Sequence, residues 1–394
     1  MNDSAVYILG GKRTPIGAFQ GALGTLTAPQ LGTAAIHAAL EASGVNADQV
    51  DEVLMGNVLS AGIGQAPARQ ASRGAGIPDS TPCTTINKVC GSGMKTIMMA
   101  AQAIKCGDAQ IVVAGGMESM TNTPYALPTA RAGMRMGNQS AVDLMIHDGL
   151  WDPYDNMHMG SCGDLCASEK GFSREELDAY SAESYRRALA AQESGKFQDE
   201  LTVVAVPQRK GDPVIVTADE EPGRGNPAKL PELRPAFSKD GVTTAGNASS
   251  INDGAAALVL ASQAAVDQND FKPIGRVVAY AQHAQEPKWF TTAPAQAVLK
   301  LLNKTNLTVA DIDLFEINEA FAVVAMTTAK DVGIPHDKLN VNGGAVSIGH
   351  PIGMTGTRLV LTALMELRRR GGRYAIASPC IGGGEATAVL VEAL

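Results

Sequence analysis

The chain is poor in aromatic residues, in basic charge and in long apolar runs. Phe, Trp and Tyr together make up 4% of the 394 residues, too few for a surface on which nucleic-acid bases stack. The formal net charge of -8 argues against general affinity for nucleic acid or an anionic membrane, because both require a basic surface. No window holds the roughly 18 unbroken apolar residues of a membrane span. The sequence therefore predicts a protein that binds neither nucleic acid nor membrane.

The first residues, MNDSAVYILGGKRTP, lack the basic segment and cleavage site of a signal peptide, so we expect a cytoplasmic protein. Its cysteines are then expected to be thiols and not a disulfide framework. Cys162 and Cys166 have C-x3-C spacing with His158 nearby, which raises the question of a metal site. A closed zinc site needs a second pair of ligands, which is missing. Packing as small apolar residues is favoured, and no metal site is predicted.

Apolar runs alternate with helical patterns along most of the chain. Residues 5–9, 50–59 and 111–114 read as strands, and residues 31–42 read as an amphipathic helix. Strands separated by helices indicate βαβ units and an α/β fold with a mostly parallel sheet.

A weak internal repeat divides this pattern into two copies. Residues 45–53 (Val-x4-Val-Asp-x-Val) match residues 307–315 (Leu-x4-Ile-Asp-x-Phe) at a shift of about 262 residues,. On this shift Cys90 falls within two residues of His350, and each is followed by a Gly-containing turn, a helical run and a strand. The repeat predicts two related α/β halves that face each other across a central cleft.

Residues 119–246 differ in composition and are rich in Met, Arg, Pro and Gly. They contain one clear helix, 173–191, opened by a capping box of Ser173 with Glu176,. We interpret them as an inserted loop domain that shapes the ligand site and mediates oligomerisation. The predicted domains are an N-terminal half (1–118 plus 247–271), this insertion (119–246) and a C-terminal half (272–394).

Cys90 is the first candidate for chemistry, within the segment Asn-Lys-Val-Cys-Gly-Ser-Gly-Met at 87–94. A cysteine at the start of a helix faces free backbone N–H groups and the positive end of the dipole, which lower its pKa. The neighbouring glycines let a substrate carbonyl approach the backbone. The alternative is a small buried cysteine at a strand–helix turn.

His350 is the second candidate, in the glycine-rich segment 340–356 that leads into a helix. A lone histidine is more often a satisfied core group than a catalyst. Its repeat relationship with Cys90 favours a base, because a Cys–His pair is the usual way to activate a thiol near neutral pH.

Two further segments offer an acid/base group and an amide. Cys380 precedes three glycines, a combination that supplies a thiol together with backbone N–H groups able to bind an oxyanion,. Asn318 lies at a strand–helix junction, where local sequence favours a helix cap. It could also hold a water against a developing negative charge.

Together these segments resemble the thiolases along essentially the whole chain. The resemblance rests on residues 65–70, 87–93, 115–120, 247–254, 318–321, 343–356 and 380–384. It implies a five-layered α-β-α-β-α fold and an enzyme in which Cys90 carries the acyl group and His350 removes its proton. Cys380 would take a proton from the methyl group of acetyl-CoA. One oxyanion hole would be His350 with a water held by Asn318, and the other the N–H groups of Cys90 and Gly382.

The resemblance also implies how coenzyme A binds, as a substrate and product together with acetyl-CoA, with no permanent cofactor. The family pattern for CoA maps onto a set of residues outside the catalytic segments: Leu150, His158, Met159, Arg224, Ser249, Ala320 and Phe321. For Leu150 and Met159 the alternative is core packing.

Residues 131–137 and 143–152 resemble the biosynthetic acetoacetyl-CoA subgroup of thiolases. This implies a reversible Claisen condensation of two acetyl-CoA to acetoacetyl-CoA, a short-chain substrate and a homotetramer built as a dimer of dimers. The chain departs from the family at Gly91, Pro379 and Glu385 and in the segments 161–166 and 289–292. Bulk at Phe290 is one way to narrow the acyl pocket.

Four other readings compete with this one. A degradative 3-ketoacyl-CoA thiolase uses the same chemistry on longer chains. A decarboxylating ketosynthase would need histidines where this chain has Asn318 and Cys380. A cysteine hydrolase gains nothing from a second thiol, and a CoA-binding scaffold requires no nucleophile, base and second acid together.

Overall fold

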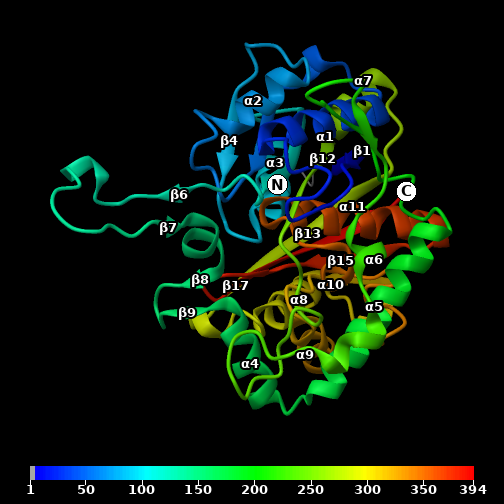
Figure 1. The fold of residues 1–394 in the computed structure, drawn as a ribbon. Coiled ribbons are helices and arrows are strands. Elements are labelled where there is room, and N and C mark those ends of the chain that lie inside the picture. The colour runs from blue at the N-terminus through cyan, green and yellow to red at the C-terminus, as the bar shows by residue number, and fades with distance from the viewer. Residues whose placement is uncertain (1–4) are drawn as a thin grey trace.

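The computed structural model describes residues 5–394, and most of its strands join into one central sheet (Figure 1). Among these residues the sheet has eleven strands in the order β14-β15-β17-β13-β1-β12-β5-β3-β4, with β16 paired to β17 and β2 paired to β12. The strands of the N-terminal half are β1 (Val6–Arg13), β2 (Gly17–Ala18), β3 (Glu52–Gly56), β4 (Cys83–Ile86), β5 (Ile111–Ser119) and β12 (Asn252–Ser262). Those of the C-terminal half are β13 (Gly275–Ala284), β14 (Leu314–Ile317), β15 (Tyr374–Ser378), β16 (Cys380–Ile381) and β17 (Glu385–Ala393).

Helices cover both halves of this sheet. Those of the N-terminal half are α1 (Ala28–Ser43), α2 (Pro67–Gly74), α3 (Ser92–Cys106) and α7 (Gln263–Asn269). Those of the C-terminal half are α8 (Ala293–Thr305), α9 (Ala322–Val332), α10 (Ala345–Ile348) and α11 (Ile352–Arg370). Helix α1 shows how local sequence sets the ends: Thr27 and Gln30 form a capping box, and Gly44 ends the helix in the left-handed region at φ 69°,.

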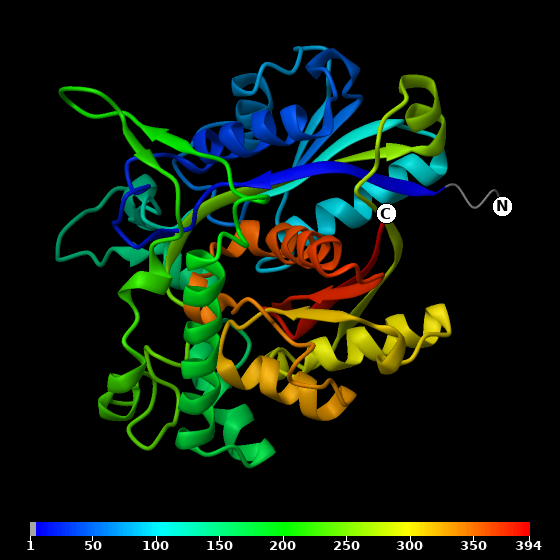
Figure 2. The same cartoon turned by 90° about the vertical axis from the view of Figure 1, so that its right-hand side faces the viewer.

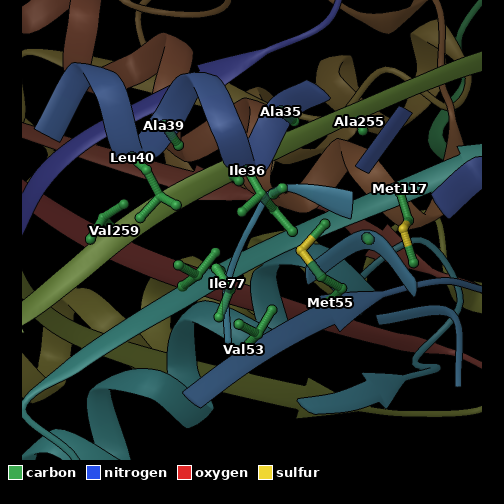
Figure 3. Packing of buried hydrophobic residues seen from close by; sticks show 14 of the residues in the cluster. Ala35, Ile36, Ala39, Leu40, Val53, Met55, Ile77, Met117, Ala255 and Val259 are labelled. Atoms are coloured by element: carbon green, nitrogen blue, oxygen red, sulfur yellow. The ribbon is translucent and has the colours of Figure 1, made fainter. Parts of the chain in front are cut away.

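Three hydrophobic clusters define five layers. Helices α1 and α2 pack on the outer face of the N-terminal strands, where Ile36, Val53 and Val259 meet (Figure 3). Helices α3 and α11 lie between the two halves, and Ile97 and Leu359 share one core with strands from both. Helices α8 and α9 cover the far face of the C-terminal strands. The order helix, sheet, helix, sheet, helix can be followed in Figure 2, and the predicted α-β-α-β-α fold is confirmed.

The strands in this architecture run in mixed directions, so the predicted mostly parallel sheet is wrong. Only three neighbouring pairs on the main path are parallel: β3 with β4, β3 with β5, and β14 with β15. The parallel strands of the N-terminal half are joined by helices, α2 between β3 and β4 and α3 between β4 and β5. β12 follows β5 after the long inserted segment and returns antiparallel, as β17 does beside β15 after a tight hairpin. Periodicity locates strands, but their direction depends on how each connection returns to the sheet.

The internal repeat is present in space. β3, α3 and β5 of the first half correspond to β14, α11 and β15 of the second. Cys90 lies two residues before the start of α3, and His350 lies two residues before the start of α11. The halves join where β1 pairs with β13 through three residue pairs.

The segment 119–246 forms short elements that lie beside the two halves. They are β6 (Tyr125–Ala126), β7 (Val142–Asp143), β8 (Trp151–Asp152), β9 (Met157–His158), α4 (Met159–Lys170), α5 (Arg174–Glu193), β10 (Val204–Val206), β11 (Val214–Val216) and α6 (Glu221–Arg224). The predicted helix 173–191 is confirmed as α5, with Ser173 and Glu176 in the expected capping box. The arm that carries β6 and β7 projects away from the body (Figure 1). The predicted domain boundaries stay a prediction.

Candidate active site

Cys90 lies in a tight turn between β4 and α3. Val89 has φ 45°, a left-handed conformation that is costly for a β-branched residue. Ser92 holds the turn in place, because its hydroxyl accepts the Lys88 N–H at 2.8 Å and donates to the Val89 carbonyl at 2.7 Å. The resulting turn directs the half-buried thiol into a cavity.

The acidity of this thiol differs from what the sequence predicts. Burial among apolar side chains raises the pKa of Cys90 to about 11, while hydrogen bonds from the N–H groups of Gly382 and of Cys90 itself lower it and the nearby Glu118 carboxyl raises it. The expected lowered pKa is wrong, because desolvation by several segments outweighs the dipole of one helix. Cys90 is therefore a neutral thiol at rest and needs a base to become a nucleophile.

His350 is placed to be that base. The ring is buried, and Nδ1 lies 2.6 Å from Thr355 Oγ1. Thr355 donates its own hydroxyl hydrogen to the Pro351 carbonyl, so it accepts from Nδ1–H and leaves the lone pair on Nε2. Burial, followed by the positive charge of Arg358, lowers the pKa of His350 to about 3. The imidazole is thus neutral near pH 7, with Nε2 available for a proton.

Asn318 does not cap a helix, which corrects the reading favoured by local sequence. Helix α9 begins at Ala322 with Phe321 at the cap position. The side chain of Asn318 is buried, and Nδ2 lies 3.3 Å from His350 Nε2. Its Oδ1 has no partner among the described residues and is therefore free to hold a water, the second role considered for this amide.

Cys380 lies on β16, directly behind the cavity, with no exposed surface. Burial, and then the neighbouring Cys90, raises its pKa well above the usual range; hydrogen bonds from the Asn318 side chain and the Ala320 backbone act in the opposite direction. Asn318 thus reaches both His350 and Cys380, and the four predicted catalytic side chains are neighbours.

The cavity above them has a volume of about 390 Å³. Most of the predicted site residues line it: Cys90, Leu150, His158, Met159, Ser249, Ala320, Phe321, His350 and Gly382. Arg224 does not; it is exposed at the end of α6, and its role stays a prediction. Phe290 lies in the wall and packs edge-on against Phe321 at 6.3 Å between ring centres.

Two residues that line or support the cavity were not predicted from the sequence. Phe237 lies in the wall and stacks on His158 at 4.7 Å between ring centres; nothing in its irregular local segment marks it. Glu118 is fully buried beside the site and accepts hydrogen bonds from the N–H groups of Val58, Leu59 and Gly353. Burial raises its pKa to about 7. The signal available in the sequence was a glutamate at the end of a strand whose other residues there are mostly small.

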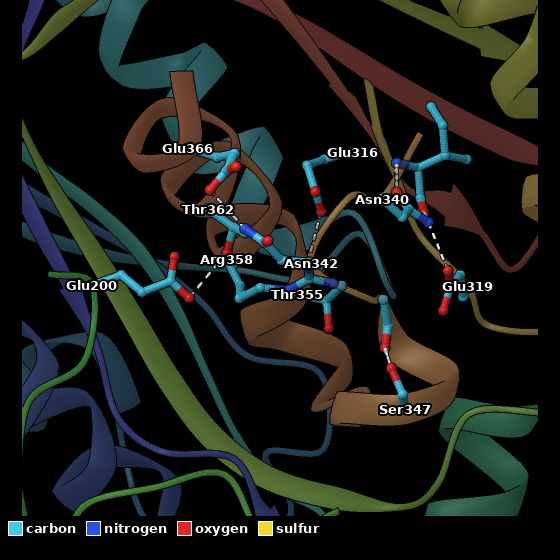
Figure 4. A network of polar contacts seen from close by, with 12 residues as sticks. Glu200, Glu316, Glu319, Asn340, Asn342, Ser347, Thr355, Arg358, Thr362 and Glu366 are labelled. Carbon is cyan, nitrogen blue, oxygen red and sulfur yellow. Dashed lines mark hydrogen bonds and ion pairs between the residues drawn. The ribbon is translucent and has the colours of Figure 1, made fainter. Parts of the chain in front are cut away.

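A buried polar network holds the second half of the site (Figure 4). Glu319 accepts hydrogen bonds from Tyr180, Ser184 and Asn340, which fixes the loop that carries Asn318. Arg358 pairs with Glu316 at 3.2 Å, both almost fully buried. Removing one partner of such a pair leaves an uncompensated buried charge.

Two other findings concern the remaining predictions. In residues 5–394 no cluster of three His, Cys, Asp or Glu side chains is suited to hold a metal ion, and Cys162 and Cys166 pack in a hydrophobic cluster. Across the same range, no helix is long and apolar enough to cross a membrane.

Comparison with known proteins agrees with this fold. Residues 6–264 match the family described as Thiolase, N-terminal domain, and residues 271–393 match Thiolase, C-terminal domain. The chain belongs to the thiolase family, and its class is therefore that of acyl-transferring enzymes.

Individual relatives narrow this class. The chain is 49% identical over 393 residues to an acetyl-CoA acetyltransferase of Allochromatium vinosum, covering 100% of both. It is 51% identical to acetyl-CoA acetyltransferase 2 of Arabidopsis thaliana, covering 100% of this chain and 98% of the relative. The Acat5 thiolase of Ascaris suum, solved in complex with coenzyme A, superposes with a TM-score of 0.94 at 45% identity, covering 99% of this chain and 100% of that one.

Proposed function

We propose that the chain is an acetyl-CoA C-acetyltransferase, which condenses two acetyl-CoA to acetoacetyl-CoA and free CoA and also runs in reverse. The observation that carries this proposal is the convergence of two thiols, a neutral imidazole and an amide: Cys90 and His350 line one apolar cavity, and Asn318 and Cys380 lie buried beside them. The names of the full-length relatives, and the coenzyme A bound to the Ascaris thiolase, support the same substrate class.

In the first step His350 Nε2 accepts the proton of Cys90, and Sγ attacks the thioester carbon of acetyl-CoA. The C–S bond to CoA breaks, and the departing CoA thiolate takes the proton of Cys380. The products are free CoA, an acetyl group on Cys90, a protonated His350 and a Cys380 thiolate. This order follows from the raised pKa of Cys380, since a thiol that is neutral at rest must lose its proton before it can act as a base.

In the second step the Cys380 thiolate removes a proton from the methyl group of another acetyl-CoA. The carbanion attacks the acetyl carbon on Cys90, a C–C bond forms, and the C–S bond breaks. Cys90 leaves as a thiolate and recovers its proton from His350. All groups return to their starting state, and the two charges formed between the steps are opposite, which reduces the cost of holding them in an apolar site.

Two sets of hydrogen-bond donors would stabilise the oxygen anions. Protonated His350, with a water held by Asn318, would face the enolate oxygen of the second acetyl-CoA. The N–H groups of Cys90 and Gly382, which already point at the thiol, would face the oxygen of the acyl group on Cys90. Losing one such donor typically costs about 10²–10³ in rate.

The test is the CoA-dependent loss of acetoacetyl-CoA absorbance, with a longer 3-ketoacyl-CoA run in parallel. Fast cleavage of the short substrate by the wild type is expected, with at least about 10²-fold loss in Cys90→Ala and Cys380→Ala. Cys106→Ala, which changes an exposed cysteine at the far end of α3, is the matched control. Preferred cleavage of the longer substrate would favour a degradative thiolase, and no wild-type cleavage of either would reject the proposed activity.

We also propose a homotetramer assembled through the arm of residues 125–143. Four apolar side chains on or beside this arm are exposed, namely Tyr125, Leu127, Met134 and Met136, the last at 98%. Exposed apolar groups gathered on one projecting segment are typical of an interaction surface. A dimer mass by light scattering would contradict this assembly.

A further inference from the structure

The turn that carries Cys90 touches a hairpin from the opposite half. We call residues 87–92 the nucleophile turn and residues 380–386, which include Cys380 and Gly382, the Cys380 hairpin. A Cβ built on Gly91 would lie 2.3 Å from Ile381 Cδ1, and one built on Gly382 would lie 3.5 Å from Val89 Cγ1. The two segments are therefore in van der Waals contact, and a residue larger than glycine at position 91 would require the Ile381 side chain to shift.

One ion pair ties these segments together. Lys88 Nζ contacts Glu385 Oε2, with the side chains 20% and 35% exposed. Within residues 5–394 no other ion pair joins the nucleophile turn to the Cys380 hairpin. Glu385 lies opposite Ile381 in the β16–β17 pairing, so its backbone is fixed relative to the glycine tip of the hairpin.

The internal hydrogen bonds of the turn do not set its distance from the hairpin. Ser92 bonds within the turn to Lys88 and Val89, and Asn87 bonds to Val89 and to the Val58 carbonyl, so neither reaches the hairpin. These bonds maintain the strained Val89 conformation. The distance between the nucleophile turn and Gly382 depends instead on contacts across the gap between the turn and the Cys380 hairpin. The contacts across it are the apolar packing of Gly91 on Ile381, the hydrogen bond from the Gly382 N–H to the Cys90 thiol and the pairing of Lys88 with Glu385; of these, the ion pair alone joins two charged side chains.

We propose that Lys88 and Glu385 are positioning residues, whose ion pair fixes the distance between the N–H groups of Cys90 and Gly382 that bind the acyl oxygen. This rests on the proposed function of those two donors. Lys88 is two residues from one donor, and Glu385 is three residues from the other, so a shift of either segment changes the geometry directly. Glu385 also offsets the charge of Lys88 near the Cys90 thiol.

The experiment measures thiolysis of acetoacetyl-CoA by the full-length protein carrying Lys88→Met, Glu385→Gln, or the exchange Lys88→Glu with Glu385→Lys. Each single change is expected to lower kcat about tenfold with KM within about threefold, because the donors act mainly in the transition state. The exchange is expected to restore kcat to within about threefold of wild type. Asp331→Asn, which breaks the similarly exposed surface pair with Lys170, is expected to leave kcat unchanged. Single variants within twofold of wild type, or an exchange no better than either single change, would overturn the proposal.

A second measurement tests the positioning role of the ion pair independently of the proposed activity. Iodoacetamide alkylates Cys90 whether or not the protein is a thiolase. A Lys88→Met/Glu385→Met variant loses both charges, so displacement of Gly382 should slow alkylation at pH 8 by about threefold, equivalent to roughly half a pKa unit. An unchanged alkylation rate would reject the positioning role even in an active enzyme. If the wild type shows no thiolysis but the double variant is still alkylated more slowly than the wild type, the positioning role of the ion pair is retained and the proposed activity is rejected.

Discussion

Replacing Thr355 by valine tests whether the tautomer of His350 drives catalysis. Threonine and valine have nearly the same shape, and Thr355 is 1% exposed, so the substitution retains the packing. The change removes the oxygen that accepts Nδ1–H at 2.6 Å. A buried donor left without a partner costs about 1–3 kcal/mol. The imidazole can avoid this cost by moving its proton to Nε2, where it can no longer accept the proton of Cys90.

The size of the effect follows from that cost. About 1.4 kcal/mol corresponds to a factor of ten, so a cost of about 1–3 kcal/mol depopulates the productive tautomer by about 5–150-fold. We expect kcat/KM for thiolysis to fall by the same factor in Thr355→Val and to recover in Thr355→Ser. The assay is the initial rate of acetoacetyl-CoA cleavage, accompanied by urea unfolding of each variant.

The control is Thr362→Val, on the same helix. It removes a buried hydrogen bond to Glu200 at 3.3 Å, visible in Figure 4, and does not touch His350. A comparable loss of stability with a rate within about threefold of wild type is expected. The tautomer argument fails if Thr355→Val is destabilised like Thr362→Val but keeps its full kcat/KM.

Three other outcomes are expected. Because burial raises the pKa of Cys90 to about 11, its alkylation rate in the free protein should rise about tenfold per pH unit from pH 8 to 10; a plateau below pH 8 would contradict the raised pKa. Phe290→Ala opens the cavity wall and should improve cleavage of a 3-ketohexanoyl substrate relative to acetoacetyl-CoA by about tenfold, with Phe237→Ala measured for comparison. Met136→Lys places a charge on the arm and should convert the proposed tetramer to a dimer by light scattering, whereas an unchanged mass would exclude this contact.

Local patterns predicted much of the fold. The matched segments 45–53 and 307–315 located β3 and β14, because a buried strand and its preceding turn depend on neighbouring residues. The capping box of Ser173 fixed the start of α5 for the same reason. The direction of β12 was not predictable in this way, because it depends on how a long insertion returns to the sheet.

The candidate site shows the same difference between features set by neighbouring residues, which were predicted, and features set by distant segments, which were not. The glycine-rich surroundings of Cys90, His350 and Cys380 marked all three in the sequence. Local sequence favoured a helix cap for Asn318, because its contact with His350 joins residues 32 positions apart; the pairing of these two residues was predicted through the family resemblance alone. The pKa of Cys90 had the wrong sign, since a local helix start was visible in the sequence and the apolar walls contributed by distant segments were not.

The pairing of α3 with α11 has a consequence for how such a site arises. The two helices hold equivalent places in the repeat, each begins two residues after a candidate catalytic side chain, and their first turns meet where Gly356 leaves no room for a Cβ beside Met94. A half joined to an identical copy would carry the same residue at both positions, either two thiols or two imidazoles. Cys90 and His350 differ, so the separation of nucleophile from base depends on two independently encoded halves within one chain. Two different halves within one chain thereby allow an asymmetric reaction on a nearly symmetric frame.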